Sequence, residues 1–502
     1  MNNKFLPGGV LFIIAFALST LAFLPRVKAG ETNTFYGLGA GNQITTGIQN
    51  SGFGNSALYS DTTGGFNTAT GYWALFLNTT GEGNTASGNR ALFLNSTGSL
   101  NTASGTEALE NNTTGDQNTA TGFYALLSNT TGEWNTASGA NALYSNTTGD
   151  GNTAVGTNAL YSNTTGNSNT ASGTNALFSN TTGHHNTATG LYGLKANTTG
   201  NYNTVSGEEA LYSNTTGNNN TASGSAALYD NMTGSQNTAS GAEALFSNTT
   251  GSYNIANGYQ SLLSNTTGGF NAANGAFVLY NNTIGNFNTA TGPGALLNNT
   301  TGSNNVALGV TAGIALTTGS GNVCIGAGVN GVAGESNTTR IRNVYSSVAS
   351  GRAVYVNADN KIGTFSSSRR FKQDILPMDK SSETLFSLKP VTFRYKKETD
   401  PSQALSFGLI AEDVAQVSPE LITRDEEGKP QTVRYEAVNA MLLNEFLKEH
   451  RKSEQQESKI EQQDAKIAQQ QKQIEALTEG LQKVSAQLEL NKAAPQTVVN
   501  NR

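Results

Sequence analysis

The apolar and polar positions in the long middle region of the chain recur with a period of 17 residues. From Asn67 the sequence reads NTATGYWALFLNTTGEG and then NTASGNRALFLNSTGSL. One asparagine is in phase at 18 positions from Asn33 to Asn322, and a second at 14 positions from Asn78 to Asn299. A glycine follows each second asparagine by three residues, from Gly81 to Gly302. Because no insertion interrupts this register, every copy is expected to have the same shape.

A unit of 17 residues with two fixed glycines is too short for a pair of helices, so it predicts one turn of a parallel β-solenoid, or β-roll. We expect two short strands per turn: NTAxG with a small Ala inward, and ALxxN with Leu inward beside an aromatic residue such as Phe76 or Tyr144. Gly71 and Gly81 are expected at corners with positive φ. Stacked turns would align the asparagines in ladders of side-chain amides. The loss of the second asparagine after Asn299 predicts a terminal cap.

Charged residues return beyond about Ser336, where the 17-residue phase ends. AVYVNADNKIGTF (353–365) predicts two short strands around a turn, and LKPVTFRYKK (388–397) and ALSFGLIA (404–411) predict further strands. The segment EDVAQVSPEL that follows predicts a helix and its stop.

From Val433 the apolar pattern becomes helical. One seven-residue register, interrupted at Ser453, joins Phe446, Ile460, Ile467, Ile474, Leu481 and Leu488. This spacing predicts a coiled coil over 446–490. Isoleucine at the first core position of the heptad, with Gln463 and Gln470 at the fourth, is compatible with a trimer. A solvated single helix is the alternative.

The fold class is therefore mainly β, with a small α+β domain and a C-terminal trimeric coiled coil. The expected segments are a signal peptide (1–29), the β-solenoid rod (30–335), a strand connector (336–365), the α+β domain (366–445), the coiled coil (446–490) and a disordered tail (491–502).

Composition excludes several classes of function. The net charge of −6 over 502 residues, without a basic patch, argues against a nucleic-acid partner. Cys324 is the only cysteine, so no disulfide forms within the chain. The adjacent His184 and His185 lack the spacing of metal ligands, and we expect no metal and no cofactor.

The N-terminus predicts export. Lys4 precedes an apolar run from Val10 to Leu24, and Val27-Lys28-Ala29 offers small residues to a signal peptidase. Cleavage near Ala29 would leave a mature chain without a membrane-spanning segment, at the bacterial cell surface or outside the cell. An uncleaved membrane anchor is the alternative.

The NTAxG repeats over residues 33 to 330 resemble the head repeats of trimeric autotransporter adhesins and the repeats of bacterial tail-fibre-like surface proteins. The resemblance implies a left-handed parallel β-roll that assembles as a trimer. Each turn also buries only two or three apolar side chains, so a single rod has a thin core. Association of several chains side by side is the expected remedy.

Four blocks, SSSRRFKQDI, LKPVTFRYKK, FGLIAEDVAQVSPELI and VRYEAVNAMLLNE, resemble the intramolecular chaperone domain of phage endosialidases and tail spikes, the peptidase S74 family, over 366 to 450. The resemblance implies trimerisation and then release by autoproteolysis with a serine and a lysine. On the family pattern S-D-x-R-x-K, Ser367 is the nucleophile, Arg370 the arginine and Lys372 the base. Ser368 stands where aspartate is usual.

The chemistry of such a pair requires a neutral lysine to take the hydroxyl proton, so burial and the neighbouring Arg369 and Arg370 must lower its pKa. Ser367 and Lys372 are five residues apart and lie on different faces of a helix or strand, so a turn or another chain must join them. Ser368, four residues from Lys372, would share a helical face with it and is the alternative nucleophile.

We therefore expect an exported, homotrimeric fibre or adhesin that cuts its own Ser366-Ser367 bond and acts on no external substrate. Its expected partners are further copies of the chain and a host surface or glycan. A prophage tail fibre is one alternative. Another is a structural fibre that does not cleave and binds glycan or ice through arrays of Thr68 and Thr79 equivalents.

Overall fold

The computed structural model describes residues 32–343, 354–356, 361–363, 366–425 and 427–491. The chain divides into two units, residues 1–346 and residues 347–502. The predicted signal peptide at 1–29 lies outside the described residues, as do residues 492–502 of the predicted tail.

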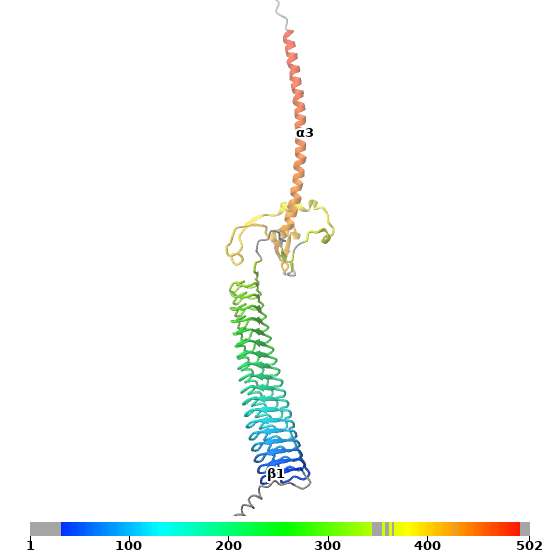
Figure 1. Cartoon of the computed structure of the whole chain (residues 1–502). Coiled ribbons are helices and arrows are strands. Elements are labelled where there is room, and N and C mark those ends of the chain that lie inside the picture. Colours follow the sequence, from blue (N-terminus) through cyan, green and yellow to red (C-terminus); the bar gives the residue numbers. More distant parts are fainter. Residues whose placement is uncertain (1–31, 344–353, 357–360, 364–365, 426, 492–502) are drawn as a thin grey trace, which may run out of the picture. The chain divides into compact units, whose positions relative to one another are not determined.

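The first unit is the predicted parallel β-solenoid (Figure 1). Within residues 32–343, nineteen strands of three residues pair in parallel, each with the next along the chain. The register advances by 17 residues per turn, as in Thr68 opposite Thr85, and by 16 at the last step, where Val323 lies opposite Thr339. The strands are β1 (Thr34–Tyr36), β2 (Ser51–Phe53), β3 (Thr68–Thr70), β4 (Thr85–Ser87), β5 (Thr102–Ser104), β6 (Thr119–Thr121), β7 (Thr136–Ser138), β8 (Thr153–Val155), β9 (Thr170–Ser172), β10 (Thr187–Thr189), β11 (Thr204–Ser206), β12 (Thr221–Ser223), β13 (Thr238–Ser240), β14 (Ile255–Asn257), β15 (Ala272–Asn274), β16 (Thr289–Thr291), β17 (Val306–Leu308), β18 (Val323–Ile325) and β19 (Thr339–Ile341).

Each turn contains one strand, so the expectation of a second strand in the ALxxN segment is wrong. Ala74 and Leu75 are both fully buried. Successive residues of a strand point to opposite faces, so a strand cannot bury both. Trp73 and Leu75 instead adopt left-handed conformations, with φ of 58° and 50°. The backbone still bonds along the solenoid axis, since the Leu75 N–H donates to the Ala91 carbonyl at 3.0 Å.

Both fixed glycines are closely packed, since a Cβ on Gly71 would lie 2.3 Å from the Gly88 carbonyl oxygen, but they differ in backbone conformation. Gly71 has a φ of +139°, as expected for a corner that only glycine adopts readily. Gly81 is not in the positive-φ region, which corrects the prediction for that position. It is required by close packing: a Cβ there would lie 2.3 Å from the Gly98 carbonyl oxygen and 2.5 Å from Asn78 Oδ1.

Two buried asparagine columns run along the solenoid, as the repeats predict. In the first column, the backbone N–H of Asn118 donates to Asn101 Oδ1 at 2.9 Å, and its Nδ2 donates to the Gly132 carbonyl at 2.8 Å. In the second, Asn129 Nδ2 donates to Asn112 Oδ1 at 2.7 Å and to the same Gly132 carbonyl at 3.0 Å. One glycine carbonyl therefore joins the two ladders in each turn.

The second ladder ends at Asn299, but the solenoid does not. Leu316 occupies the next position of the column and is fully buried. Asn299 Oδ1 consequently has no hydrogen-bond partner among the described residues. Strand pairing continues to β19, so the change at Leu316 marks the end of a ladder and not the cap that we predicted.

The second unit contains short strands around one small core and a single long helix. Its elements are β20 (Tyr355–Val356), β21 (Ile362–Gly363), the 3-10 helices η1 (Arg369–Phe371) and η2 (Asp379–Ser387), β22 (Val391–Phe393), β23 (Ser406–Gly408), α2 (Ala411–Val417), the 3-10 helix η3 (Pro419–Leu421), β24 (Ile422–Arg424), β25 (Pro430–Val433) and α3 (Tyr435–Leu490). The pairs β20 with β21, β22 with β23 and β24 with β25 are antiparallel. These elements confirm the predicted strands and the predicted α2 and α3.

The core of the second unit packs the start of α3 against α2 and β25. Its buried residues are Val414, Leu421, Ile422, Val433, Val438 and Met441. Farther along α3, the predicted apolar seam is exposed on the single chain, with Ile467 at 59% and Ile474 at 55%. Among the described residues, no helix combines the length and the apolar character needed to cross a membrane.

Asp61 replaces an asparagine in the second ladder and is fully buried. Its Oδ1 accepts hydrogen bonds from the Gly64 N–H at 3.1 Å and from Asn78 Nδ2 at 3.2 Å. Its Oδ2 has no partner among the described residues. Burial raises the pKa of the carboxyl to about 7, although these hydrogen bonds lower it. Only the protonated carboxyl can donate a hydrogen bond as an asparagine amide does.

This arrangement predicts that the first turns of the solenoid lose stability as the pH rises from about 4 to about 7. The unfolded carboxyl ionises near its ordinary pKa of about 3.9, whereas the folded one resists ionisation, at a cost on the order of 4 kcal/mol above pH 7. The variant Asp61→Asn is expected to remove this dependence, measured by hydrogen exchange of the turns around Asp61 at pH 4 and pH 8. The reciprocal variant Asn95→Asp should introduce it elsewhere. An equal effect of Asp61→Asn at both pH values would contradict the prediction.

Candidate functional site

The cluster predicted from the sequence lies on an exposed segment of the second unit. The chain passes from Ser366, Ser367 and Ser368 into η1, a 3-10 helix of one turn. The carbonyl of Ser368 accepts the Phe371 N–H at 3.0 Å, and this bond closes the turn. Lys372 follows with an extended backbone, φ −126° and ψ 142°. The turn therefore reverses the chain locally between the serines and the lysine.

Among the described residues, no hydrogen bond joins the side chain of Ser367 or Ser368 to that of Lys372. The helical spacing that favoured Ser368 is also not realised, because η1 ends before Lys372. The Arg370 guanidinium lies over the Phe371 ring, 4.6 Å from its centre. All of residues 366–377 are exposed.

A second polar cluster, which the sequence did not indicate, joins η2 to α3. Ser382 is fully buried, and its hydroxyl donates to Glu445 Oε1 at 2.5 Å. Asn444 Nδ2 donates to the same hydroxyl at 2.7 Å, and Lys448 Nζ donates to Glu445 Oε1 at 2.6 Å. The hydrogen bond from Lys448, followed by that from Ser382, lowers the pKa of Glu445. Ser382 and Asn444 are 62 residues apart, and no local motif in either segment signals the contact.

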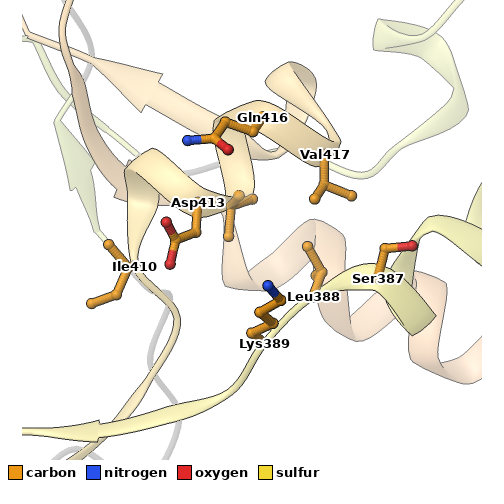
Figure 2. A pocket seen from close by; sticks show the side chains of 8 residues that line it. Ser387, Leu388, Lys389, Ile410, Asp413, Gln416 and Val417 are labelled. Carbon is orange, nitrogen blue, oxygen red and sulfur yellow. The ribbon is translucent and has the colours of Figure 1, made fainter.

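A small pocket lies between α2 and the segment that links η2 to β22 (Figure 2). Its volume is about 130 Å³, well below the roughly 300–1,000 Å³ of ordinary ligand sites. Its lining includes the charged Lys389 and Asp413 and the apolar Ile410, Val414 and Val417. The pocket has room for a few water molecules or one short side chain, and not for a sugar chain or a cofactor.

The comparison with known families agrees with this local structure. Residues 367–423 match the family model of peptidase S74, the chaperone of endosialidase. The matched segment begins at Ser367 and contains Lys372, η2, the pocket and α2. No curated protein and no solved structure matches the chain. The resemblance of the repeats to adhesin heads is therefore supported only as far as the β-solenoid fold.

The two threonine columns named for the alternative function differ in their surroundings. The Thr79 hydroxyl donates to the Ser96 carbonyl of the next turn at 2.9 Å, so its proton is already used in a hydrogen bond within the solenoid. Thr68 and its neighbour Thr70 are exposed on either side of the buried Ala69.

Across the described residues, no group of His, Cys, Asp and Glu could hold a metal ion.

The Ser382 cluster predicts a measurable loss of stability on truncation. Ser382→Ala would remove one of the two acceptors of the half-buried Asn444 amide, which also donates to the Asp379 carbonyl, and one donor to Glu445, at a cost of about 0.5–1.5 kcal/mol per hydrogen bond. The expected result is faster hydrogen exchange in η2 and the first turns of α3. Ser381→Ala, at an exposed neighbouring position, is the matched control. Equal exchange in the two variants would show that the cluster does not hold η2 to α3.

Proposed function

We propose that the protein is an exported, homotrimeric surface fibre whose C-terminal domain aligns three chains and then releases itself by cutting the Ser366-Ser367 bond. Ser367 is the nucleophile and Lys372 the base, with Arg370 in support. The observation that carries the proposal is the chaperone-of-endosialidase match, which begins at Ser367 in a chain whose preceding unit is a β-solenoid.

The trimer is supported by α3. Its seam repeats every seven residues through Ile460, Ile467, Ile474, Leu481 and Leu488, and all five side chains are exposed on the single chain. A helix with such a seam hides it by pairing with equivalent helices. Three parallel copies are compatible with isoleucine at these positions, and the matched family is a chaperone family.

The proposed trimer also explains why cleavage would occur only after the chains assemble. A serine attacks an amide only when a base takes its proton, and a lysine does so only in its neutral form. Burial favours the neutral form of an amine, whereas Lys372 and the three serines are exposed in the single chain. A neighbouring chain that covers this segment would desolvate the pair, so cleavage would follow trimerisation.

The dyad predicts a fragment of defined mass. Wild-type protein is expected to yield a C-terminal fragment that begins at Ser367. Lys372 takes the proton of the Ser367 hydroxyl, whose Oγ attacks the Ser366 carbonyl; the Ser366-Ser367 amide bond breaks as its nitrogen takes that proton, and water then hydrolyses the ester of Ser366. Ser367→Ala and Lys372→Ala should each abolish the fragment, measured by intact mass after folding. Ser368→Ala is the matched control and should still cleave.

Two results would contradict this assignment. A fragment that begins at Ser368 would transfer the nucleophile's role to that residue. Full-length wild-type chains in a stable trimer would make the domain a permanent clamp.

The seam predicts the oligomeric state. Ile467→Asp combined with Ile474→Asp would place six carboxylates in the core of a trimer, and the cost of burying them should abolish assembly. Light scattering is expected to give three chains for wild type and one for the variant. Gln462→Asp combined with Gln469→Asp is the matched control, with the same change of charge at positions outside the seam. A wild-type mass of one chain would contradict the proposal.

A phage or prophage tail fibre is the second candidate, favoured by the same match and the same solenoid. Such a protein needs no export signal. Fusing residues 1–35 to a reporter distinguishes the two, since secretion of the reporter supports the exported fibre.

A further inference from the structure

One column of the solenoid forms a long strip of mostly aromatic side chains. We use the term aromatic strip for the positions at every seventeenth residue from Tyr59 to Leu297. Thirteen of these fifteen positions hold an aromatic residue or Leu, and only Glu110 and Lys195 belong to the acidic and basic residue types. At about 4.8 Å per turn, the strip is about 65 Å long. Nearly all of its side chains stay partly exposed on the single chain.

The rings of the strip stack on one another along the axis. Tyr161 lies 4.9 Å from Tyr144 and 5.1 Å from Phe178, in each case with only 6° between the ring planes. Tyr229 is placed in the same way, 5.0 Å from both Tyr212 and Phe246. Because these ring faces are in contact with each other, the strip presents ring edges and tyrosine hydroxyls outward. Such a surface is apolar and ridged, with few open faces on which a sugar could stack.

The two charged residues of the strip both contact other side chains of the solenoid. Glu110 is buried and forms an ion pair with Arg90, whose guanidinium lies 4.9 Å from the Phe93 ring centre. Lys195 Nζ donates to the Tyr212 hydroxyl at 2.8 Å and lies 4.9 Å from the centres of the Tyr192 and Tyr212 rings. Glu110 is therefore paired within the chain, whereas Lys195 keeps its positive charge against two ring faces and a tyrosine hydroxyl, and it is the one position of the strip with a charge that lacks a counter-charge.

Other columns of the solenoid lack such a strip. The strand columns of Thr68 and Thr70 are polar and exposed. The corner column that begins at Phe66 exposes some aromatic residues but is interrupted by Gly83, Gln117 and Gly151. A long apolar surface on a single chain marks a site of association, and the aromatic strip is the surface that meets this description.

We propose that the aromatic strip is the face through which the rods of neighbouring copies pack in the trimer. The argument for a second copy is the repeat. A rod of the same sequence has the same spacing per turn, so each of its turns can lie level with a turn of the strip at all fifteen positions. A globular partner presents no surface with this period. The inference rests on the proposed homotrimer and adds the surface that joins the rods.

The test compares chemical labelling of two cysteine variants of the full-length chain. Ser162→Cys lies beside Tyr161 of the strip, and Ser172→Cys is the matched control on the exposed strand column. Native Cys324 is fully buried and serves as an unreactive background. Each variant is labelled with a maleimide, both in the assembled protein and in the Ile467→Asp, Ile474→Asp background that dissociates the chains. Circular dichroism verifies that the solenoid remains folded in every sample.

We expect assembly to slow labelling of Ser162→Cys at least tenfold and to leave Ser172→Cys unchanged. Equal rates for Ser162→Cys in assembled and dissociated chains would overturn the inference while leaving the trimer in place. That outcome would leave the strip open to another ligand, such as a glycan chain along the rod. Protection of Ser172→Cys alone would assign the interface to the strand column. If light scattering finds single chains in the wild type, the homotrimer and this inference both fail.

Discussion

The carbonyl group of one glycine in each turn holds the solenoid together. The Gly132 carbonyl accepts a hydrogen bond from Asn118 of one ladder and from Asn129 of the other. Both amides are fully buried, and an unpaired polar group in that position would cost about 1–3 kcal/mol. The carbonyl is reached only because Gly132 has no Cβ, which would lie 2.6 Å from both Asn129 Oδ1 and the Gly149 carbonyl oxygen. Asparagine, glycine and asparagine are therefore a single structural requirement, repeated in every regular turn.

This constraint divides the 17 residues into those that are fixed and those that are free. The ladders, the glycines and the Ala-Leu pair determine the inside of a turn. They thereby also set the distance between equivalent outward residues of successive turns. Whatever side chain occurs at an outward position is repeated at the same spacing as the backbone. Polar positions such as Thr68 become exposed columns, and aromatic positions such as Tyr161 become a long strip. A small change in the repeat therefore changes a whole face of the rod.

The same logic explains which features the sequence predicts. The period and both ladders follow from spacing alone, because stacking identical turns brings identical side chains together. The left-handed backbone of the ALxxN segment was not predicted from spacing. The sequence did contain an indication of it, because Ala74 and Leu75 are adjacent and apolar, and a strand cannot bury two neighbours on one face. Gly81 was misread because a repeated glycine can serve φ or close packing, and sequence does not separate the two. Ser382 depends on Asn444, 62 residues away, which no local pattern records. Lys372 follows from a family motif, and the surface proposed to cover it would come from a second chain, which no pattern within one sequence identifies.

Regularity also creates a difficulty that the C-terminal unit is suited to resolve. Two identical rods shifted by one turn still place a turn beside a turn everywhere except at the ends. Their packing therefore hardly distinguishes the correct alignment from an alignment displaced by one turn. The seam of α3 has a different period, seven residues, and is interrupted at Ser453. A register set by that seam is unique, because an alignment must satisfy the seam and the break together. In the proposed trimer, the C-terminal domain and the repetitive rod would thus be complementary: the rod would supply contact area, and the helix would supply the register that the rod cannot specify.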